Sequence, residues 1–380
     1  MHAPAKTKVD WGDPPWEIDF TPAPTPLSDH TDFAVIGAGF TGLAAAAWLR
    51  RCDPGKTVAV FEASRIGAGA SGRTGGMALA ESAAGDLPGL GDVLAGVEQI
   101  FRELGVECEL SLPGAWEIGR GGKAAPGSAI AWNDSGRLRA VAEVPGGTLN
   151  PGKAVSGLAR AAHRLGAQVF ENSPVTNVEW REQPVLQLGA ENRAVRAGKI
   201  LLATNALSLG LSGIVEDTTG ARLTLAIAAE RLGEDALEGL GLAPRKPFYT
   251  VDLPYLWGRV FGDGGVIWGG GLVSPRVPGD LYSVSISSPE TVKTLASLER
   301  RVRGLHPALA GVRFTHRWGG PILFRESWEP VFDWHPQSRR NAVVVGAFAG
   351  HGVMLSSYLG RWAAEALLGR RDLPFWGKIQ

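Results

Sequence analysis

The sequence has little cysteine, no excess of charge of one sign and no long apolar run. Its two cysteines, Cys52 and Cys108, are too few for a disulfide framework, and we expect no metal site. Lys plus Arg equals Asp plus Glu, 38 against 38, which argues against a nucleic-acid partner. The opening MHAPAKTKVD has no apolar signal core, and we expect no membrane span. These absences favour a globular protein of a reducing compartment, which we expect to be the cytoplasm.

The chain of 380 residues is long enough for two domains and is rich in glycine and tryptophan. Its first segment, residues 1–31, is a Pro-rich N-terminal arm whose prolines exclude a helix or a central strand. Trp11, Trp16 and Phe20 leave two interpretations of this arm open. It is either a disordered leader or an arm that lies on the protein surface.

A glycine-rich turn follows the first predicted strand. In VIGAGFTGLAAAAWL, Gly37, Gly39 and Gly42 form the pattern G-x-G-x-x-G between a strand and a helix. Gly37 permits the tight turn, Gly39 lets a pyrophosphate approach the backbone, and Gly42 lets the helix pack closely on the strand. Glu62 ends the next buried strand, KTVAVFEA, where an acid can bind ribose hydroxyls. A glycine turn without a ligand is the alternative, but strand, turn, helix and acid together predict a dinucleotide site.

Two further glycine-rich segments favour FAD over a nicotinamide nucleotide. ASRIGAGASGRTGGM follows Glu62 directly and offers backbone without side chains, which can wrap a flat ligand. NAVVVGAFAG predicts a buried strand, and Gly350 and Gly352 then lead into the last helix, whose dipole would face the negative charge of a reduced flavin. We find no second G-x-G-x-x-G after a strand. Electrons are therefore expected to come from the substrate and to leave to oxygen or an electron carrier.

The order of strand and helix patterns predicts an α/β (α+β) fold. Signals for βαβ units at both ends, with an antiparallel-looking middle, indicate a discontinuous Rossmann-like FAD-binding domain with an inserted, mostly antiparallel β-sheet substrate domain. VLAGVEQIFRELG and GKAVSGLARAAHRLG predict amphipathic helices. We expect the FAD-binding domain at 32–88, 148–218 and 333–372, and the substrate domain at 89–147 and 219–332.

The motifs together resemble one family. The glycine turn with Glu62, the GASGRTGG loop, LLATNA, GRVFGDGGVIWGGG and GAFAGHGV occur in the order typical of FAD-dependent oxidoreductases of the D-amino-acid oxidase (DAO) family. Within it, the chain is most similar to the γ-glutamylputrescine oxidoreductase-like branch and to glycine and sarcosine oxidases. The resemblance covers residues from about 32 to 369. It implies an FAD-dependent amine oxidase or dehydrogenase, in which hydride passes from a CH–NH carbon to flavin N5 and the imine product hydrolyses.

The resemblance also implies where FAD binds. Residues 203–205 would lie beside the pyrophosphate, and Glu62 and Val175 would meet the adenosine. Residues 71–77 would run beneath the flavin, and 350–355 would lie at its pyrimidine edge. The expected cofactor-binding residues are Gly37, Ala38, Gly39, Phe40, Thr41, Gly42, Glu62, Ala63, Ser64, Arg65, Ser71, Gly72, Arg73, Thr74, Gly75, Gly76, Met77, Val175, Ala203, Thr204, Asn205, Gly350, His351, Gly352, Val353, Met354 and Leu355.

Two departures from the sarcosine oxidase pattern bear on the chemistry. Several relatives attach flavin through a cysteine in the segment that matches GGPILFRES, which has no cysteine here, so we expect non-covalent FAD. The Arg and Lys that hold the substrate carboxylate in sarcosine oxidase are matched by Gly76 and Met354. Without that cationic pair a carboxylate would be poorly neutralised. We therefore expect a small-molecule amine that needs no α-carboxylate.

The candidate catalytic residues are Tyr255, Trp257, Arg259 and His351. Tyr255 and Trp257 belong to a strand that faces the flavin in relatives, and they either wall an amine pocket or are core aromatics. Arg259 binds an acidic substrate group or pairs with a structural carboxylate. His351 acts in the chemistry or serves as a hydrogen-bond partner within its glycine loop. Packing is expected for three other tryptophans, Trp318, Trp328 and Trp334.

Two other functions stay open at the level of sequence. The same architecture oxidises a CH–OH bond in hydroxy acid dehydrogenases of the wider superfamily. A catalytically silent flavin-binding protein is the other alternative, and the intact glycine loops argue against it.

Overall fold

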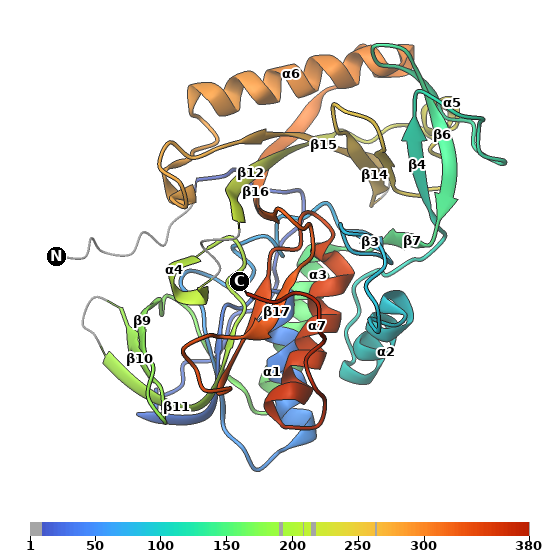
Figure 1. Ribbon diagram of the computed structural model, residues 1–380. Coiled ribbons are helices and arrows are strands. Elements are labelled where there is room, and N and C mark those ends of the chain that lie inside the picture. The colour runs from blue at the N-terminus through green and yellow to red at the C-terminus, as the bar shows by residue number, and fades with distance from the viewer. Residues whose placement is uncertain (1–9, 190–192, 208, 214–217, 263, 380) are drawn as a thin grey trace.

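Two eight-stranded sheets organise the chain, which the computed structural model describes at residues 10–189, 193–207, 209–213, 218–262 and 264–379. The lower sheet in Figure 1 has the order β17–β18–β11–β1–β2–β8, and β10 and β9 extend from β11. Neighbouring strands from β18 to β8 run parallel, which confirms the βαβ arrangement expected at both ends of the chain. Its strands are β1 (His30–Ile36), β2 (Val58–Phe61), β8 (Gln168–Phe170), β9 (Val175–Glu179), β10 (Val185–Leu188), β11 (Arg193–Leu202), β17 (Val331–Trp334) and β18 (Ala342–Gly346).

Helices α1 (Phe40–Cys52), α3 (Pro151–Arg164) and α7 (Gly352–Leu367) cover one face of this sheet (Figure 1). Small residues let α1 lie between the other two, because its alanines at 44–47 are fully buried. A Cβ on Gly360 of α7 would lie 2.5 Å from the carbonyl oxygen of Thr41 in α1. The sequence therefore permits a close approach of the two helices that begin at the site.

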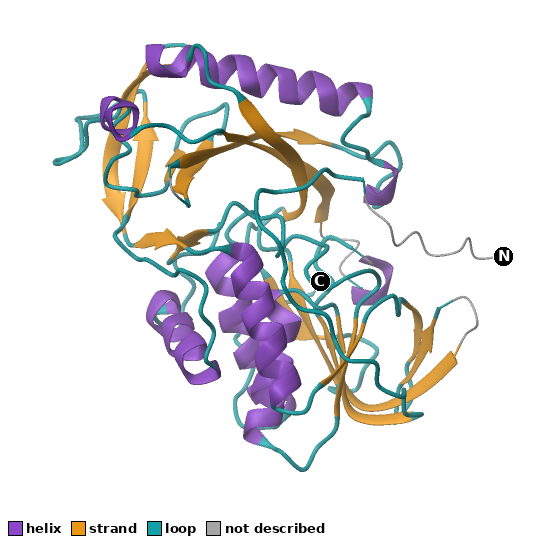
Figure 2. Cartoon of the chain, turned by 180° about the vertical axis from the view of Figure 1, so that it is seen from behind, coloured by secondary structure: helices purple, strands orange, loops and turns teal. Residues whose placement is uncertain are grey.

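The upper sheet is mostly antiparallel, with the order β16–β12–β15–β14–β13–β4–β6–β5. Helix α6 (Pro289–Leu305) crosses its outer face (Figure 1, Figure 2). In the core of this half, Trp132 packs edge to face against both Phe248 and Trp268. Its strands are β4 (Ala115–Gly119), β5 (Ala131–Asn133), β6 (Arg137–Val144), β12 (Thr218–Ala229), β13 (Phe248–Thr250), β14 (Trp257–Phe261), β15 (Gly265–Val273) and β16 (Phe314–Arg325). The short elements are β3 (Met77–Leu79), β7 (Gly146–Thr148), α4 (Leu209–Ser212), α5 (Glu234–Gly239), η1 (Leu281–Ser283) and η2 (Pro307–Leu309).

Helix α2 (Val93–Leu104) packs with the lower half of the molecule. Its buried Val97, Ile100 and Phe101 share a core with α1, α3 and α7. We expected residues 89–147 to belong to the substrate domain, but α2, which lies in this range, packs with the half expected to bind FAD. The hydrophobic period of a sequence predicts an amphipathic helix and its apolar face, but it does not predict against which surface that face packs.

The N-terminal arm lies on the protein from residue 10 onward. Trp11 is fully buried, and its indole Nε1 donates to the carbonyl of Val284, 3.0 Å away in the upper half. Trp16 Nε1 donates to the carbonyl of Gly72 at 2.8 Å in the lower half. Of the two interpretations of the arm, the described residues therefore adopt the ordered one, and the arm ties the two halves together.

The helices of the described chain are all too short or too polar to cross a membrane. In the same residues, His, Cys, Asp and Glu side chains form no group of three or more that could hold a metal ion. Cys52 and Cys108 are both free thiols.

Candidate active site

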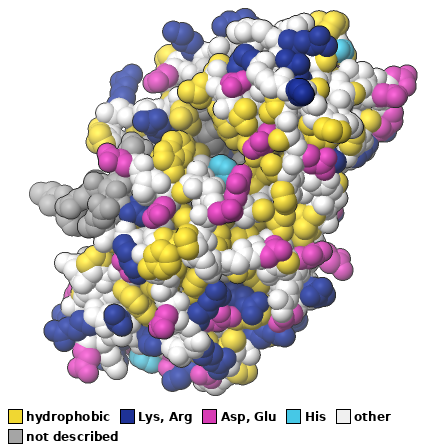
Figure 3. Space-filling model, turned by 45° about the vertical axis from the view of Figure 1, so that its right-hand side comes forward, with side chains coloured by type: hydrophobic (Ala, Val, Ile, Leu, Met, Phe, Trp, Pro, Cys, Tyr) yellow, Lys and Arg dark blue, Asp and Glu magenta, His cyan; other side chains and the backbone are white. Residues whose placement is uncertain are grey.

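A cavity of about 890 Å³ lies where the lower sheet faces the upper one. It begins at the carboxyl ends of β1, β2 and β11 and extends to β12, β14, β15 and β16 of the upper sheet. Its volume lies in the range of sites that hold a cofactor or a sizeable ligand. Figure 3 shows hydrophobic side chains gathered across the middle of one face, where the surface is hollowed beside a histidine.

The glycine turn at the lower end of the cavity has geometry that requires glycine. Gly37 has φ +104°, and a Cβ there would lie 2.7 Å from the carbonyl oxygen of Ala203. A Cβ on Gly42 would overlap the carbonyl oxygen of Gly37. The N-cap residue Gly39 has no side chain to cap α1, and Ser71 Oγ accepts a hydrogen bond from the first helical N–H, that of Phe40, at 2.9 Å. The turn thus presents backbone and a positive dipole end to the cavity, as an anion-binding turn does.

Glu62 lies where β2 ends and lines the cavity. Its Oε2 accepts a hydrogen bond from the backbone N–H of Ala38 at 2.9 Å, and its Oε1 accepts one from Ser64 at 3.0 Å. Burial raises the pKa of this carboxyl, while the two N–H donors act in the opposite direction. Glu62 therefore fixes the glycine turn itself, besides facing the space where a ribose is expected.

The second glycine loop is held by a hydrogen bond of its own and by contacts from the arm and from β16. Arg73 donates from Nε to the carbonyl of Ala68 at 3.0 Å and from Nη1 to the carbonyl of Gly12 in the arm at 2.5 Å. Trp318 of β16 donates from Nε1 to the carbonyl of Arg73 at 2.8 Å. The sequence identified the loop but gave no signal that the arm and β16 secure it, because those partners are remote in the chain.

The cavity walls contain two buried hydroxyls without a partner in the described chain, Thr204 Oγ1 and Ser356 Oγ. An unpaired buried hydroxyl costs free energy, so such groups point to a polar ligand. Ser356 lies in the first turns of α7, whose start at Gly352 also lines the cavity. Together with the glycine turn, this donor set fits FAD.

Most of the predicted cofactor residues line the cavity. They are Gly37, Gly39, Phe40, Thr41, Glu62, Ala63, Ser71, Arg73, Thr74, Gly75, Met77, Val175, Ala203, Thr204, Asn205, Gly350, His351, Gly352 and Val353. The remaining ones do not line it, and they are Ala38, Gly42, Ser64, Arg65, Gly72, Gly76, Met354 and Leu355. Gly42 and Gly72 face backbone atoms, and Met354 and Leu355 lie in the helix core, so their contribution is to packing.

Gly76 and Met354, which we matched to a carboxylate-binding pair, do not line the cavity. Met354 is fully buried among apolar side chains of the lower half, and a Cβ on Gly76 would overlap the carbonyl oxygen of Leu149. Arg73 is the one Lys or Arg among the described residues that line the cavity, and its guanidinium already donates to backbone carbonyls. It is therefore the described cavity lining, with no unengaged Lys or Arg, that disfavours a substrate carboxylate.

The four candidate catalytic residues separate into two groups. Tyr255, Trp257 and His351 line the cavity, whereas Arg259 does not. Arg259 is 6% exposed, and its Nε donates to the carbonyl of Gly75, behind the second glycine loop. Burial lowers the pKa of Arg259 to about 10, so the guanidinium stays charged near neutral pH. Its hydrogen-bond partner is a loop carbonyl, and the Glu109 carboxylate interacts electrostatically with the guanidinium, so both contacts fit the structural role considered for Arg259.

Trp257 lies between the two halves of the molecule. A Cβ on Gly75 of the lower half, or on Gly269 of β15, would overlap its ring. His351 accompanies it in the cavity wall, and burial lowers the pKa of its imidazole, which favours the neutral form. The site therefore contains both an aromatic wall and a histidine whose neutral form is favoured by burial.

Two of the three tryptophans expected to be packing residues line the cavity, Trp318 and Trp328. Trp328 is 50% exposed and Leu253 is 84% exposed, so both lie at the rim. Trp334 packs against the core of the lower half, as expected. Sequence reasoning missed the rim because nothing local distinguishes an exposed aromatic residue from a buried one.

This site, at the carboxyl edge of a Rossmann-like sheet, is that of a flavin-dependent oxidoreductase. The chain belongs to the DAO family of FAD dependent oxidoreductases, whose family model matches residues 32–366. It is 28% identical over 384 residues to the gamma-glutamylputrescine oxidoreductase of Escherichia coli (strain K12), covering 89% of this chain and 84% of that protein. It is 26% identical to a probable oxidoreductase OrdL of Rhizobium meliloti (strain 1021), over 91% of this chain and 85% of that protein.

Solved structures agree with the fold. The glycine oxidase of Geobacillus kaustophilus superposes with a TM-score of 0.69 at 18% identity, covering 91% of this chain and 96% of that one. The L-proline dehydrogenase of P. horikoshii superposes with a TM-score of 0.66 at 17% identity, covering 92% and 96%. The expected family, fold class and FAD cofactor are confirmed.

Proposed function

We propose that the protein oxidises a small-molecule amine at its CH–NH bond. FAD held at the glycine turn would supply the hydride acceptor. The nitrogen lone pair then forms the C=N bond, an N–H proton is released, and water hydrolyses the imine. The observation that carries the proposal is a cavity that continues from the glycine turn into an aromatic wall with no unengaged Lys or Arg among its described lining residues. The similarity to gamma-glutamylputrescine oxidoreductase supports it.

The residues of the chain would act by position and by exclusion of water. The reaction needs a neutral amine nitrogen close to the flavin more than it needs a dedicated base. Tyr255 and Trp257 would wall the reacting carbon, and a neutral His351 would avoid repelling a cationic substrate. Arg259 would keep the loop at Gly75 in place from behind.

We further propose that FAD binds without a covalent bond to a side chain. Cys108 is buried in the core of the lower half, and Cys52 lies at the end of α1, so neither thiol lines the cavity. Acid precipitation of the yellow protein should release all flavin into the supernatant. Flavin that stays in the pellet would contradict this proposal.

Electrons would leave to oxygen or to an electron carrier, and the two free thiols are consistent with the cytoplasm that we expect. Stopped-flow reoxidation of the reduced protein in aerated buffer distinguishes the two acceptors. Rapid reoxidation indicates an oxidase, and persistence of the reduced form indicates a carrier.

Anaerobic mixing with panels of amines and hydroxy acids tests the reaction class. Amines should bleach the flavin and hydroxy acids should not. At subsaturating amine, the rate should rise roughly tenfold per pH unit toward the amine pKa of about 10.4, because only the neutral nitrogen reacts. Bleaching by hydroxy acids alone would favour CH–OH oxidation, and bleaching by neither panel would favour the catalytically silent alternative.

A further inference from the structure

The connection between β13 and β14, residues 251–256, forms part of the cavity mouth. Leu253 and Tyr255 both line the cavity, although they are 84% and 41% exposed. Leu272 and Trp328 add further exposed apolar surface to the same lining. Large apolar side chains gathered at the entrance of a cavity mark a surface that contacts a ligand.

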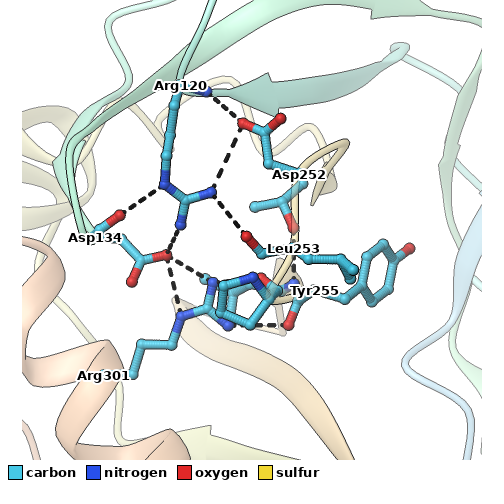
Figure 4. Close-up of polar contacts among 9 residues, drawn as sticks. Arg120, Asp134, Asp252, Leu253, Tyr255 and Arg301 are labelled. Carbon is cyan, nitrogen blue, oxygen red and sulfur yellow. Dashed lines mark hydrogen bonds and ion pairs between the residues drawn. The ribbon is translucent and has the colours of Figure 1, made fainter.

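Two arginines donate hydrogen bonds to three consecutive carbonyl oxygens of this loop, those of residues 253–255 (Figure 4). Arg120 donates from Nη1 to the carbonyl of Leu253 at 3.3 Å. Arg301 donates from Nη2 to the carbonyl of Pro254 at 2.7 Å and from Nη1 to that of Tyr255 at 3.0 Å. Such charge-assisted hydrogen bonds are stronger than neutral ones and fix direction as well as distance.

Asp134 joins the two arginines. Its Oδ2 lies 2.9 Å from Arg120 Nη2 and 2.6 Å from Arg301 Nη2, and the Asp134 side chain is 8% exposed. Arg120 also donates from Nε to the backbone carbonyl of Asp134 at 2.9 Å. Asp252 accepts from the Arg120 backbone N–H at 2.6 Å. Two carboxylates and two guanidiniums thus balance in charge, and because they are partly shielded from water they interact more strongly than an exposed pair.

These contacts bring together three remote parts of the upper half. Arg120 follows β4, Asp134 lies in the turn between β5 and β6, and Arg301 lies on α6. The base of the loop is closed by a separate hydrogen bond, which the backbone N–H of Thr250 donates to the carbonyl of Leu256 at 2.8 Å. The arginines are therefore not needed to close the loop. They fix the position of its tip, residues 253–255.

We propose that Asp134 is a positioning residue that acts through Arg120 and Arg301. It holds Leu253 and Tyr255 against the carbon chain of the substrate, and this wall selects amines with an apolar chain. The inference rests on the proposed amine oxidation. It adds the substrate class and the residues that set it.

The test uses the FAD-loaded full chain and n-alkylamines from methylamine to hexylamine. Burial of each added methylene should tighten the Kd for flavin reduction by roughly fourfold in the wild type. Asp134→Asn should flatten this gradient, while the limiting rate of reduction falls much less than the affinity for long amines. Leu253→Ala should flatten it as well. Glu299→Gln is the matched control, because Glu299 also lies on α6 and pairs with Arg317 and Arg303, away from the loop.

Hydrogen exchange at residues 250–257 provides a readout that does not depend on turnover. Exchange should rise in Asp134→Asn and stay at the wild-type level in Glu299→Gln. A chain-length gradient in Asp134→Asn equal to that of the control, or unchanged exchange in the loop, would overturn the inference.

Arg301→Lys keeps the charge but loses the planar fork that donates to two carbonyls. If Asp134→Asn does not fold, Arg301→Lys replaces it, with the same expected changes in the chain-length gradient and in loop exchange. If no amine reduces wild-type FAD, the proposed function fails and the substrate class falls with it. The positioning role of Asp134 is then judged by hydrogen exchange alone, and unchanged exchange overturns that as well.

Discussion

Backbone atoms form the lower end of the cavity, whereas side chains form its upper end. At the lower end, close approaches are between backbone atoms, as at Gly42 against the Gly37 carbonyl. At the upper end, side chains make the wall, and the Trp257 ring fills the space beside Gly75 and Gly269. Backbone cannot be shortened or rotated aside, whereas a side chain can be exchanged. The lower end therefore suits a constant cofactor, and the upper end can be adapted to a substrate.

The two ends also differ in how their residues are arranged along the chain. The glycine turn and the acid at Glu62 lie within one βαβ unit. The upper wall takes Tyr255 and Trp257 from one connection and strand, and Trp318 and Trp328 from another more than fifty residues later. A contiguous motif can be identified in a sequence, but a wall assembled by a sheet cannot.

Gly42→Ala should have the largest effect, at the lower end. The new methyl group would lie 1.9 Å from the carbonyl oxygen of Gly37, which belongs to rigid backbone, and so severe an overlap should cost about 3 kcal/mol or more, the upper end of the range for overpacking. Affinity for FAD should fall by roughly a hundredfold or more, measured by fluorescence titration of the apoprotein. Gly304→Ala is the control, because Gly304 is a helical glycine of α6 with open space around it. Equal FAD affinity of the two variants would break the comparison.

Glu62→Ala should follow, because it removes an acceptor of two backbone N–H groups and of the expected ribose hydroxyls. Loss of a hydrogen bond to a charged group costs about 1.5–3 kcal/mol, so the Kd for FAD should rise roughly tenfold or more. Glu62→Gln keeps an acceptor and should lose less. A Kd unchanged in Glu62→Ala would show that this carboxylate does not contact the adenosine.

Trp328→Ala should leave the lower end unaffected. Its ring is half exposed at the rim, so its removal should cost little folding free energy. Affinity for long-chain amines should fall by roughly tenfold, equivalent to about 1.4 kcal/mol, while the Kd for FAD stays at the wild-type value. Anaerobic reduction and FAD titration on the same variant measure both. Parallel losses of FAD and amine affinity would argue that the two ends are not separable.

The smallest effect concerns the pH dependence of stability at His351, which lies between the two ends. Burial lowers the pKa of this imidazole in the folded state, so the unfolded chain takes up the proton first as the pH falls below about 6.5. Stability is therefore lost on acidification. His351→Gln should reduce the difference in urea midpoint between pH 7.5 and pH 5.5. His335 is also buried with a lowered pKa and stays in place in both proteins, so its contribution cancels.

The sequence by itself determined the cofactor end. Gly37, Gly39, Gly42 and Glu62 lie within one local unit, whose turn, helix start and strand end follow from backbone geometry and short-range spacing. The discontinuous fold was also predictable, because buried parallel strands and amphipathic helices have characteristic periods at both ends of the chain.

The tertiary structure alone decided the rest. It packed α2 against α7, placed Arg259 behind the glycine loop and buried Met354, none of which the sequence specified. It also brought Asp134 between Arg120 and Arg301 from three remote elements. The physical reason is the same in each case. A side chain takes its role from the surface that it meets after folding, and hydrophobic pattern and charge specify that it must find a partner without specifying which one.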